Sequence, residues 1–226
     1  MSATAAATAA VAATPKCNFF WKPNDYFGEL SQWYKAPFVC DDDAFTTVDE
    51  FVMFQKAKVF GDAEMATKII FGAYVHSSTY ANMEREVKNF DQEVWYEHAF
   101  RTVVLANLCK FTQNERLREI LMGTGDNVLI EINPQDKIWE IGFSRYDEWL
   151  NPNRYAAKKT GMAMMYARDL IRERLERGDE EPFVASSELP EMDIEAILKD
   201  YRARVQKLRL YKKGRIVNHH AWKKLR

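Results

Sequence analysis

An acid and a lysine stand seven residues apart in residues 47–57, a segment otherwise rich in large apolar side chains. Because seven residues make about two helical turns, a helix would carry Asp49 and Lys56 on the same face. Glu50 follows the acid directly, and Gln55 precedes the lysine. A carboxylate and an amine beside apolar residues suit acid–base or nucleophilic chemistry. On spacing alone, however, an ordinary surface acid and surface lysine are the favoured interpretation.

Three further patches combine polar or charged residues with apolar neighbours. Their candidate residues are Ser31 and Trp33 in residues 28–34, Trp95, Arg101 and Lys110 in residues 90–114, and Asp126, Glu131, Asp136, Trp139 and Gly142 in residues 124–142. The third patch places acids and a tryptophan in a loop after a predicted strand, a common way to build a site on a rigid scaffold. Trp95 opens a predicted helix, where a position in the core is favoured over stacking on a ligand.

The cysteines and acids give no sign of a metal centre. Cys17, Cys40 and Cys109 form neither a CxxC pair nor a cluster with histidine, so neither zinc nor a disulfide framework is indicated. The three acids of residues 41–43 are consecutive, so their side chains diverge, and this favours a solvated turn over a metal site. We therefore predict chemistry that needs no metal and no cofactor.

The composition is that of an ordinary globular chain of one domain with extensions. Of the 226 residues, 47% are hydrophobic and 29% are charged, and the net charge of −1 makes the whole molecule no obvious binder of polyanions. No run reaches the roughly 18–20 apolar residues of a membrane helix, so no membrane role is expected. An odd number of cysteines without a secretory signal favours an intracellular location, in the cytoplasm by preference and in the nucleus as the alternative.

Hydrophobic periodicity predicts an α+β fold, a mainly helical single domain around a small β-sheet with a C-terminal helical extension. Thr47 is the predicted N-cap of the first helix, Glu50 completes a capping box, and Gly61 ends the helix. Further helices are expected from Asp62 onward and over residues 91–110, 114–122 and 161–177. Strands are expected over residues 19–21, 128–132 and 139–143.

Both ends of the chain differ in composition from the domain, which we place at residues 18–178. Residues 1–17 are rich in Ala and Thr and are predicted to be a disordered lead-in. Residues 179–190 are acidic, contain Pro and Ser, and are predicted to be a linker. Residues 191–226 are predicted to form a basic amphipathic helix and tail. A solvated helix face packed on the domain is favoured, with contact to nucleic acid through the segment from Lys199 to Arg226 as the alternative.

The order of these patches resembles the YbiA-like, or NADAR, family. The resemblance covers about residues 26–172, and each fragment is a weak signal that gains its meaning from the shared order and spacing. The shared positions are Ser31, Thr47, Gln55, Lys56, Ala57, Asp62, Arg85, Trp95, Lys110, Phe111, Gln113, Asn114, Leu117, Thr124, Gly125, Asp126, Glu131, Asp136, Trp139, Gly142, Gly161 and Arg168.

The resemblance implies an enzyme that hydrolyses an N-glycosidic bond between a ribose C1 and nitrogen. The implied substrates are ADP-ribose attached to guanine, free or in nucleic acid, and phosphoribosylamino-pyrimidine intermediates of riboflavin synthesis. Breaking such a bond builds positive charge on the sugar and negative charge on the leaving group. Asp49, with Glu50 as the fallback, and Asp136 are the candidate carboxylates. Lys56 is the candidate nucleophilic amine toward an opened ribose.

The remaining candidates are expected to bind the substrate. Arg85 and Lys110 are candidate phosphate contacts, since a guanidinium or an ammonium suits charged oxygens. Trp95 and Trp139 are candidates for stacking on the base or closing the pocket. The other candidate substrate contacts are Ser31, Trp33, Gln55, Asp126 and Gly142.

The sequence departs from the family pattern within the same patches. The family's Glu is the shorter Asp49 here, its His is Glu50, its Asn-Phe is Gln32 followed by Trp33, and its Gly after the tryptophan is Glu140. These departures leave a second hypothesis open, a non-catalytic module that binds ADP-ribose or a nucleotide. A third hypothesis is a nucleic-acid-associated protein whose basic C-terminal segment docks the pocket onto a polymer.

Overall fold

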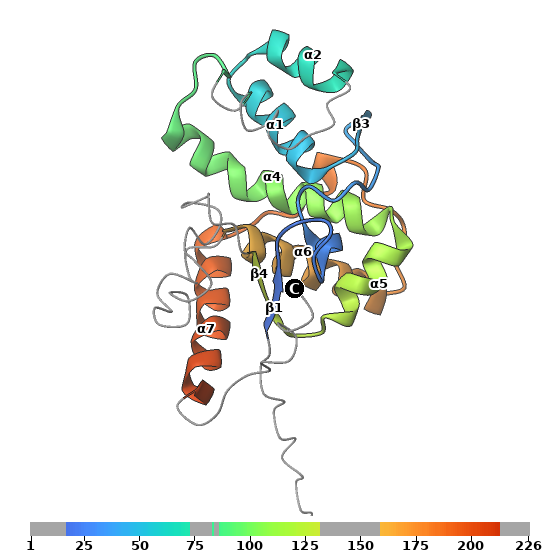
Figure 1. Ribbon diagram of the computed structural model, residues 1–226, viewed down its shortest axis with the longest axis vertical. Helices are drawn as coiled ribbons and strands as arrows, with labels where there is room; N and C mark the ends of the chain where they lie inside the picture. The colour runs from blue at the N-terminus through green and yellow to red at the C-terminus, as the bar shows by residue number, and fades with distance from the viewer. Residues whose placement is uncertain (1–16, 73–82, 84–85, 132–158, 213–226) are drawn as a thin grey trace, which may run out of the picture.

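The computed structural model describes residues 17–72, 83, 86–131 and 159–212, and this part of the chain is mainly helical (Figure 1). Its strands form two small sheets. β1 (Cys17–Phe20) pairs in parallel with β4 (Val128–Glu131), and β2 (Phe38–Cys40) pairs antiparallel with β3 (Asp43–Phe45). A parallel pair requires a crossover, and the chain between β1 and β4 supplies it with most of the helices. Cys17 belongs to β1 and not to the predicted lead-in.

The first two helices begin and end where local sequence signals predict. α1 (Val48–Val59) starts at the N-cap Thr47, whose Oγ1 accepts a hydrogen bond from the N of Glu50 over 3.1 Å. Gly61 follows the helix with a φ of 69°, a left-handed conformation that glycine adopts without strain. α2 (Ala63–Phe71) then begins at Asp62, whose Oδ1 accepts from the N of Met65 over 3.1 Å. These two caps confirm the prediction.

The long helix α4 (Gln92–Thr112) passes through the middle of the molecule. Its N-cap Asp91 accepts hydrogen bonds from the N of Glu93 and of Val94. Every residue from 102 to 112 is buried, so this half of the predicted helix is enclosed on all sides. The reason is packing on both sides, since α1 covers one flank of α4 and α6 covers the other (Figure 1).

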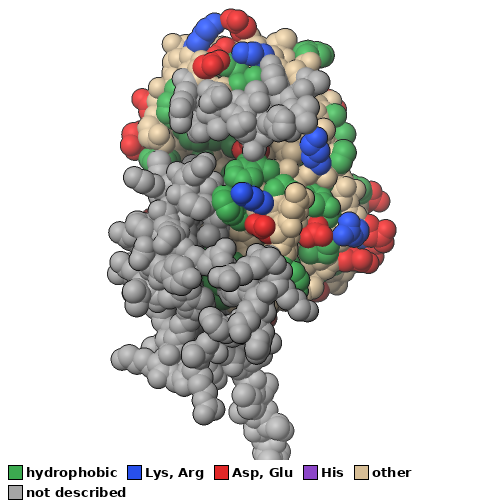
Figure 2. Space-filling model, in the orientation of Figure 1, with side chains coloured by type: hydrophobic (Ala, Val, Ile, Leu, Met, Phe, Trp, Pro, Cys, Tyr) green, Lys and Arg blue, Asp and Glu red, His purple; other side chains and the backbone are tan. Residues whose placement is uncertain are grey.

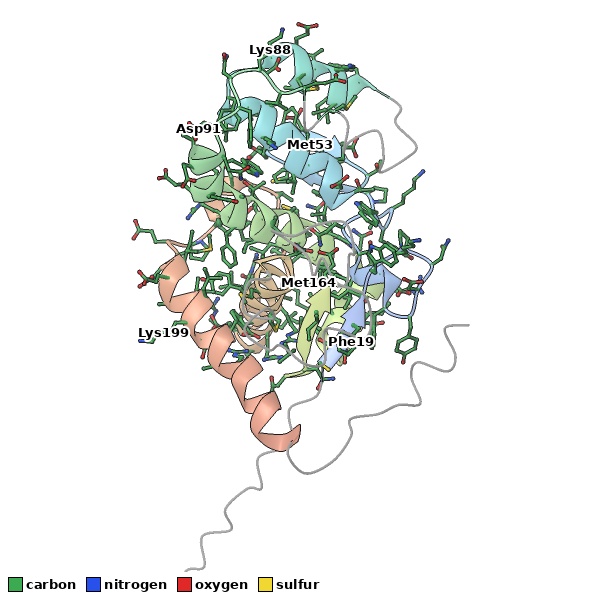
Figure 3. All side chains as sticks on the ribbon, turned by 60° about the vertical axis from the view of Figure 1, so that its left-hand side comes forward. Phe19, Met53, Lys88, Asp91, Met164 and Lys199 are labelled. Carbon is green, nitrogen blue, oxygen red and sulfur yellow. The ribbon has the colours of Figure 1, made fainter. Side chains whose placement is uncertain are left out.

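Two more helices complete the packing around β4. α5 (Glu115–Gly123) follows α4 directly, and α6 (Lys159–Glu176) lies between α4 and β4, with Met164 in the interior (Figure 3). Gly161 permits this close approach, because a Cβ there would lie 2.3 Å from the carbonyl oxygen of Leu129. No helix in the described ranges is both long and apolar enough to cross a membrane.

The segment 179–190, predicted as a linker, packs on the domain. Phe183 is buried, its N donates to Oγ1 of Thr112 over 2.8 Å, and its carbonyl oxygen accepts from Nε2 of Gln113 over 2.7 Å. The short 3₁₀ turn Ser186–Glu188 follows. The last helix, α7 (Ile194–Lys212), then packs along α6 through the buried Tyr201. The burial of Phe183 and its two hydrogen bonds therefore hold residues 179–190 on the domain, although the composition of this segment is mainly polar.

Candidate active site

Lys56 is buried between aromatic rings on α1. Its side chain is only 2% exposed, and its Nζ lies 4.0 Å from the centroid of the Phe90 ring and 5.7 Å from that of Trp95. Trp95 lies in the first turn of α4, and Phe90 stands just before the N-cap Asp91. An ammonium over an aromatic face is attracted by the ring quadrupole, most strongly where water is excluded. The predicted catalytic lysine is therefore held in a desolvated, aromatic surrounding.

A tight turn between α2 and α4 positions Phe90. Asn89 has a φ of 55°, and the N of Lys88 donates to Oδ2 of Asp62 over 2.9 Å. This hydrogen bond and the one from the N of Met65 hold the pKa of Asp62 below its usual value. Lys88 and Asp91 mark this end of the molecule in Figure 3. One carboxylate thus caps α2 and pins the turn that carries Phe90.

The other predicted acid of the helix, Asp49, lies in the first turn of α1 and is partly exposed. Its N donates to the carbonyl oxygen of Gln32 over 3.2 Å, so the loop of residues 31–33 lies beside it. Along the helix axis Asp49 and Lys56 are about 10 Å apart. The helix therefore presents a carboxylate and an amine along one flank, at a separation that a bound sugar phosphate can bridge.

Glu50 has a different surrounding from Asp49. Its side chain is buried, and its Oε2 accepts from both the N and the Oγ1 of Thr46, over 2.6 and 2.8 Å. The expected capping box is present in a variant form, because the carboxylate reaches Thr46 and not the N-cap Thr47. The fallback catalytic acid is thus engaged in fixing the start of α1.

Lys110 lies at the buried end of α4. Its Nζ donates to the carbonyl oxygens of Glu29 and Ser31, over 2.8 and 2.9 Å. Burial lowers the pKa of Lys110 to about 7, and the negative charges of Glu131 and Glu29 oppose that shift. The geometry is that of a residue that positions the loop carrying Ser31 and not of one that contacts a phosphate.

The remaining predicted substrate contacts are spread over two parts of the fold. Ser31 is buried, and its Oγ accepts from the N of the half-buried Trp33 over 3.3 Å. Gln55 is half-buried on α1, next to Lys56. Trp95 is 3% exposed, which agrees with the favoured core position while one face still serves Lys56.

Asp126 lies away from this group. It belongs to the turn before β4, its side chain is 90% exposed, and it forms an ion pair with Arg172 of α6 at 3.2 Å. β4 runs from that turn toward Glu131, whose charge acts on Lys110. The structure therefore places Asp126 at the opposite end of β4 from Lys110. Four other predicted site residues, Arg85, Asp136, Trp139 and Gly142, lie outside the described residues.

Three residues of this region received no role from the sequence. Phe90 stands just before the N-cap Asp91, with Trp95 five residues on, which is the spacing of a hydrophobic staple and a signal that the sequence contained. Nε2 of Gln32 is buried without a hydrogen-bond partner. Arg168 is fully buried and donates from Nη1 to Oγ1 of Thr124 and to the carbonyl oxygen of Asn127, so it supports the turn before β4.

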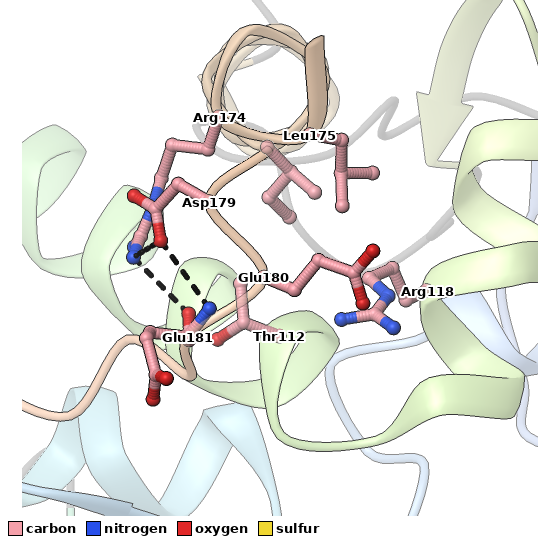
Figure 4. A pocket seen from close by; sticks show the side chains of 8 residues that line it. Thr112, Arg118, Arg174, Leu175, Asp179, Glu180 and Glu181 are labelled. Atoms are coloured by element: carbon pink, nitrogen blue, oxygen red, sulfur yellow. Dashed lines mark hydrogen bonds and ion pairs between the residues drawn. The ribbon is translucent and has the colours of Figure 1, made fainter. Parts of the chain in front are cut away.

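A shallow hollow lies elsewhere, near the end of α4 (Figure 4). Its charged lining combines three acids, Asp179, Glu180 and Glu181, with Arg118 and Arg174, and Arg174 is engaged by Asp179 over 2.7 and 3.0 Å. None of the predicted site residues that the structure describes lines this hollow. Among the side chains that Figure 2 colours by type, positive and negative ones are interspersed.

The fold and the buried lysine define an α+β domain with a candidate site along α1, and comparisons assign its family. The model of the NADAR domain matches residues 19–172, and the chain belongs to this family. The solved NMR structure of the Escherichia coli protein YbiA superposes with a TM-score of 0.56 at 22% identity, over 72% of this chain and 89% of that one. This likeness confirms the predicted fold.

Two relatives show sequence similarity over about half of this chain. N-glycosidase R617 of Acanthamoeba polyphaga mimivirus is 33% identical over 120 residues, which are 51% of this chain and 69% of the relative. Protein irg-1 of Caenorhabditis elegans is 30% identical over 104 residues, which are 46% of this chain and 49% of that protein. The chain thus spans about half the length of the second relative.

Proposed function

We propose that this chain is an N-glycosidase, an enzyme that hydrolyses the bond between a ribose C1 and a nitrogen. The observation that carries the proposal is the burial of Lys56 against Phe90 and Trp95, with Asp49 on the same helix. A lysine in a pocket of low polarity is suited to nucleophilic chemistry. Membership of the NADAR family and the similarity to a relative named N-glycosidase support this assignment.

The proposed reaction proceeds through the amine of Lys56. Ring opening first breaks the bond between C1 and the ring oxygen, which takes up a proton, and leaves C1 doubly bonded to the leaving nitrogen. The Nζ of Lys56 then gives up a proton and adds to C1, the bond from C1 to the leaving nitrogen breaks, and that nitrogen departs with a proton. Water then hydrolyses the imine between Lys56 and the sugar, which releases the sugar and restores the amine. Asp49 stabilises the positive charge at C1 and transfers the protons that these steps require.

The chemistry of the site suits substrates that pair a ribose phosphate with a flat nitrogenous base. We propose ADP-ribose attached to guanine, or a phosphoribosylamino-pyrimidine, as the substrate class. Aromatic rings at Phe90 and Trp33, which are both partly exposed, offer apolar surfaces for such groups. A panel of ADP-ribosyl-guanosine, ADP-ribosylated DNA or RNA and free phosphoribosyl-pyrimidines separates these classes by product release.

The decisive test compares the wild type with Lys56→Met in turnover and in trapping with borohydride. We expect a borohydride-stable adduct between the sugar and Lys56 in the wild type, and neither adduct nor turnover in the variant. Lys58→Met, which changes an exposed lysine of the same helix, is the matched control. Full turnover by Lys56→Met would overturn the lysine mechanism. Tight ligand binding without product in the wild type would instead favour a binding module.

The basic segment that begins near Lys199 belongs to the same proposal as a contact for polymeric substrates. Lys199 is exposed on α7, away from the face that Tyr201 packs on α6 (Figure 3). If the segment binds nucleic acid, affinity for ADP-ribosylated DNA or RNA must fall steeply with salt, while affinity for the free nucleoside must not. Equal salt dependence for both substrates would limit the segment to packing.

A further inference from the structure

The two rings that face Lys56 differ in their exposure. Trp95 is 3% exposed and Phe90 is 39% exposed, although the ring of Phe90 lies nearer to the ammonium. Trp95 is thus part of the fixed core within α4. Of the two rings, Phe90 is therefore the one that borders solvent.

The position of Phe90 is built by the fold. Its ring meets Phe60 edge to face, with centroids 5.2 Å apart and an interplanar angle of 70°. Two residues before Phe90, the N of Lys88 donates to the carboxylate of Asp62, and Asp91 caps the helix that follows. The ring is therefore fixed from both chain directions and from one edge, while part of its surface borders solvent. Phe71, at the end of α2 and 83% exposed, offers a contrast.

We propose that Phe90 is a positioning residue that shields the Lys56 amine from solvent and aligns it for attack. This inference rests on the proposed function, in which the amine of Lys56 attacks C1 of the substrate. With its Nζ over the ring face, Lys56 has few rotamers open to it, and the attraction between cation and ring holds the side chain in place. An amine held in this way meets C1 of the substrate already aligned.

A chemical probe tests the shield without any substrate. We would acetylate the folded protein with an amine reagent at low stoichiometry and measure each lysine by peptide mass spectrometry. Lys58, exposed two residues away on the same helix, is the internal reference. We expect Phe90→Ala and Phe90→Leu to increase the labelling rate of Lys56 severalfold relative to Lys58. Phe90→Tyr keeps the ring face and retains the slow labelling, as does the control Phe71→Ala.

Steady-state kinetics test the alignment. We expect kcat of Phe90→Leu to fall by about 2- to 30-fold, the range that corresponds to a cation–π contact, with a smaller change in KM. Phe90→Tyr should restore most of kcat. Phe90→Leu retains an apolar side chain at the staple position, so a thermal unfolding midpoint near that of the wild type separates alignment from stability.

The outcomes distinguish this inference from the proposed function. Unchanged labelling of Lys56 in both Phe90→Ala and Phe90→Leu would overturn the shield, and unchanged kcat in Phe90→Leu would overturn the alignment. Full turnover by Lys56→Met would instead overturn the lysine mechanism while the labelling result stands by itself. Faster labelling together with a lower kcat, both reversed in Phe90→Tyr, supports the inference.

Discussion

Lys110 donates from its Nζ to the carbonyl oxygen of Ser31 over 2.9 Å and so joins the buried end of α4 to the loop beside Asp49. The next residue of that loop, Gln32, accepts in turn from the N of Asp49. Two hydrogen bonds therefore connect the core of the domain with the start of the candidate catalytic helix. Lys110 lies about 22 Å along α4 from Trp95, so the same helix supports both ends of the site.

Replacing this lysine is expected to loosen the loop. In Lys110→Met the carbonyl oxygens of Glu29 and Ser31 lose a buried donor, which costs about 1–3 kcal/mol of unfolding free energy for such groups. Urea denaturation measures the loss, and Lys58→Met, an exposed lysine, should change stability by less than about 0.5 kcal/mol. Equal stability of the two variants would contradict the positioning role.

The pKa of Lys110 also predicts a pH dependence. Its value is about 7 in the folded protein, against about 10.4 for an unperturbed lysine, so the unfolded chain binds more protons between these values. The contribution of Lys110 to stability therefore rises from about pH 7 upward, by at most about 1.4 kcal/mol per pH unit, and is flat below pH 6. Urea unfolding from pH 6 to 9.5 measures it.

Lys110→Met is the reference for that experiment, because it removes this one titration and leaves all other groups. The difference in unfolding free energy between wild type and variant should grow with pH. A difference that stays constant or shrinks over this range would mean that the ammonium remains charged in the core, held by Glu131 and the two carbonyl oxygens.

Substitutions of the two neighbouring acids of α1, Asp49 and Glu50, should have clearly different effects on kcat. Asp49→Asn removes the charge proposed to act at C1, and we expect kcat to fall by about 100-fold or more. Glu50→Gln keeps an oxygen that accepts from the N and Oγ1 of Thr46, so its turnover should remain within about threefold of the wild type. A reversed order of the two effects would identify Glu50 as the catalytic acid.

Much of the helical framework follows from short-range signals in the sequence. Thr47 and Asp62 cap their helices because a side-chain oxygen and a backbone N–H only two or three residues away suffice. Gly61 ends α1 for an equally local reason. The all-round burial of residues 102–112 depends instead on α6, more than 45 residues further on, so periodicity within the segment does not reveal it.

The residues of the candidate site also divide into those that local spacing predicts and those that only tertiary packing places. Lys56 and Asp49 were predicted together because helical spacing alone sets their relation. Lys110 was expected to contact a phosphate, since an ammonium suits charged oxygens, and only tertiary packing places it in the core. Phe90 lies over Lys56 because the turn before α4 packs against α1, more than 30 residues earlier in the chain. The staple spacing indicates that Phe90 packs near the start of α4, but not that it contacts Lys56.

The attachment of α7 gives the last prediction. Asp169 on α6 accepts from the Oη of Tyr201 over 2.9 Å and from Nη1 of Arg204 over 3.0 Å. Burial and the charge of Asp169 raise the pKa of Tyr201, so this phenol stays neutral and donates at all ordinary pH values. We expect Asp169→Ala to cost about 2 kcal/mol, because it leaves the buried hydroxyl of Tyr201 without its acceptor and removes one of the two carboxylates that bind Arg204.

Asp200→Ala is the matched control for this prediction. Asp200 accepts from Nε of the same Arg204 over 2.9 Å, but its side chain is 57% exposed, and an exposed pair contributes less than about 1 kcal/mol. Hydrogen exchange should show α7 opening in Asp169→Ala and remaining protected in Asp200→Ala. Equal protection in both variants would mean that apolar contacts such as those of Leu198 hold the helix. In that case the ion pairs set only its register along α6.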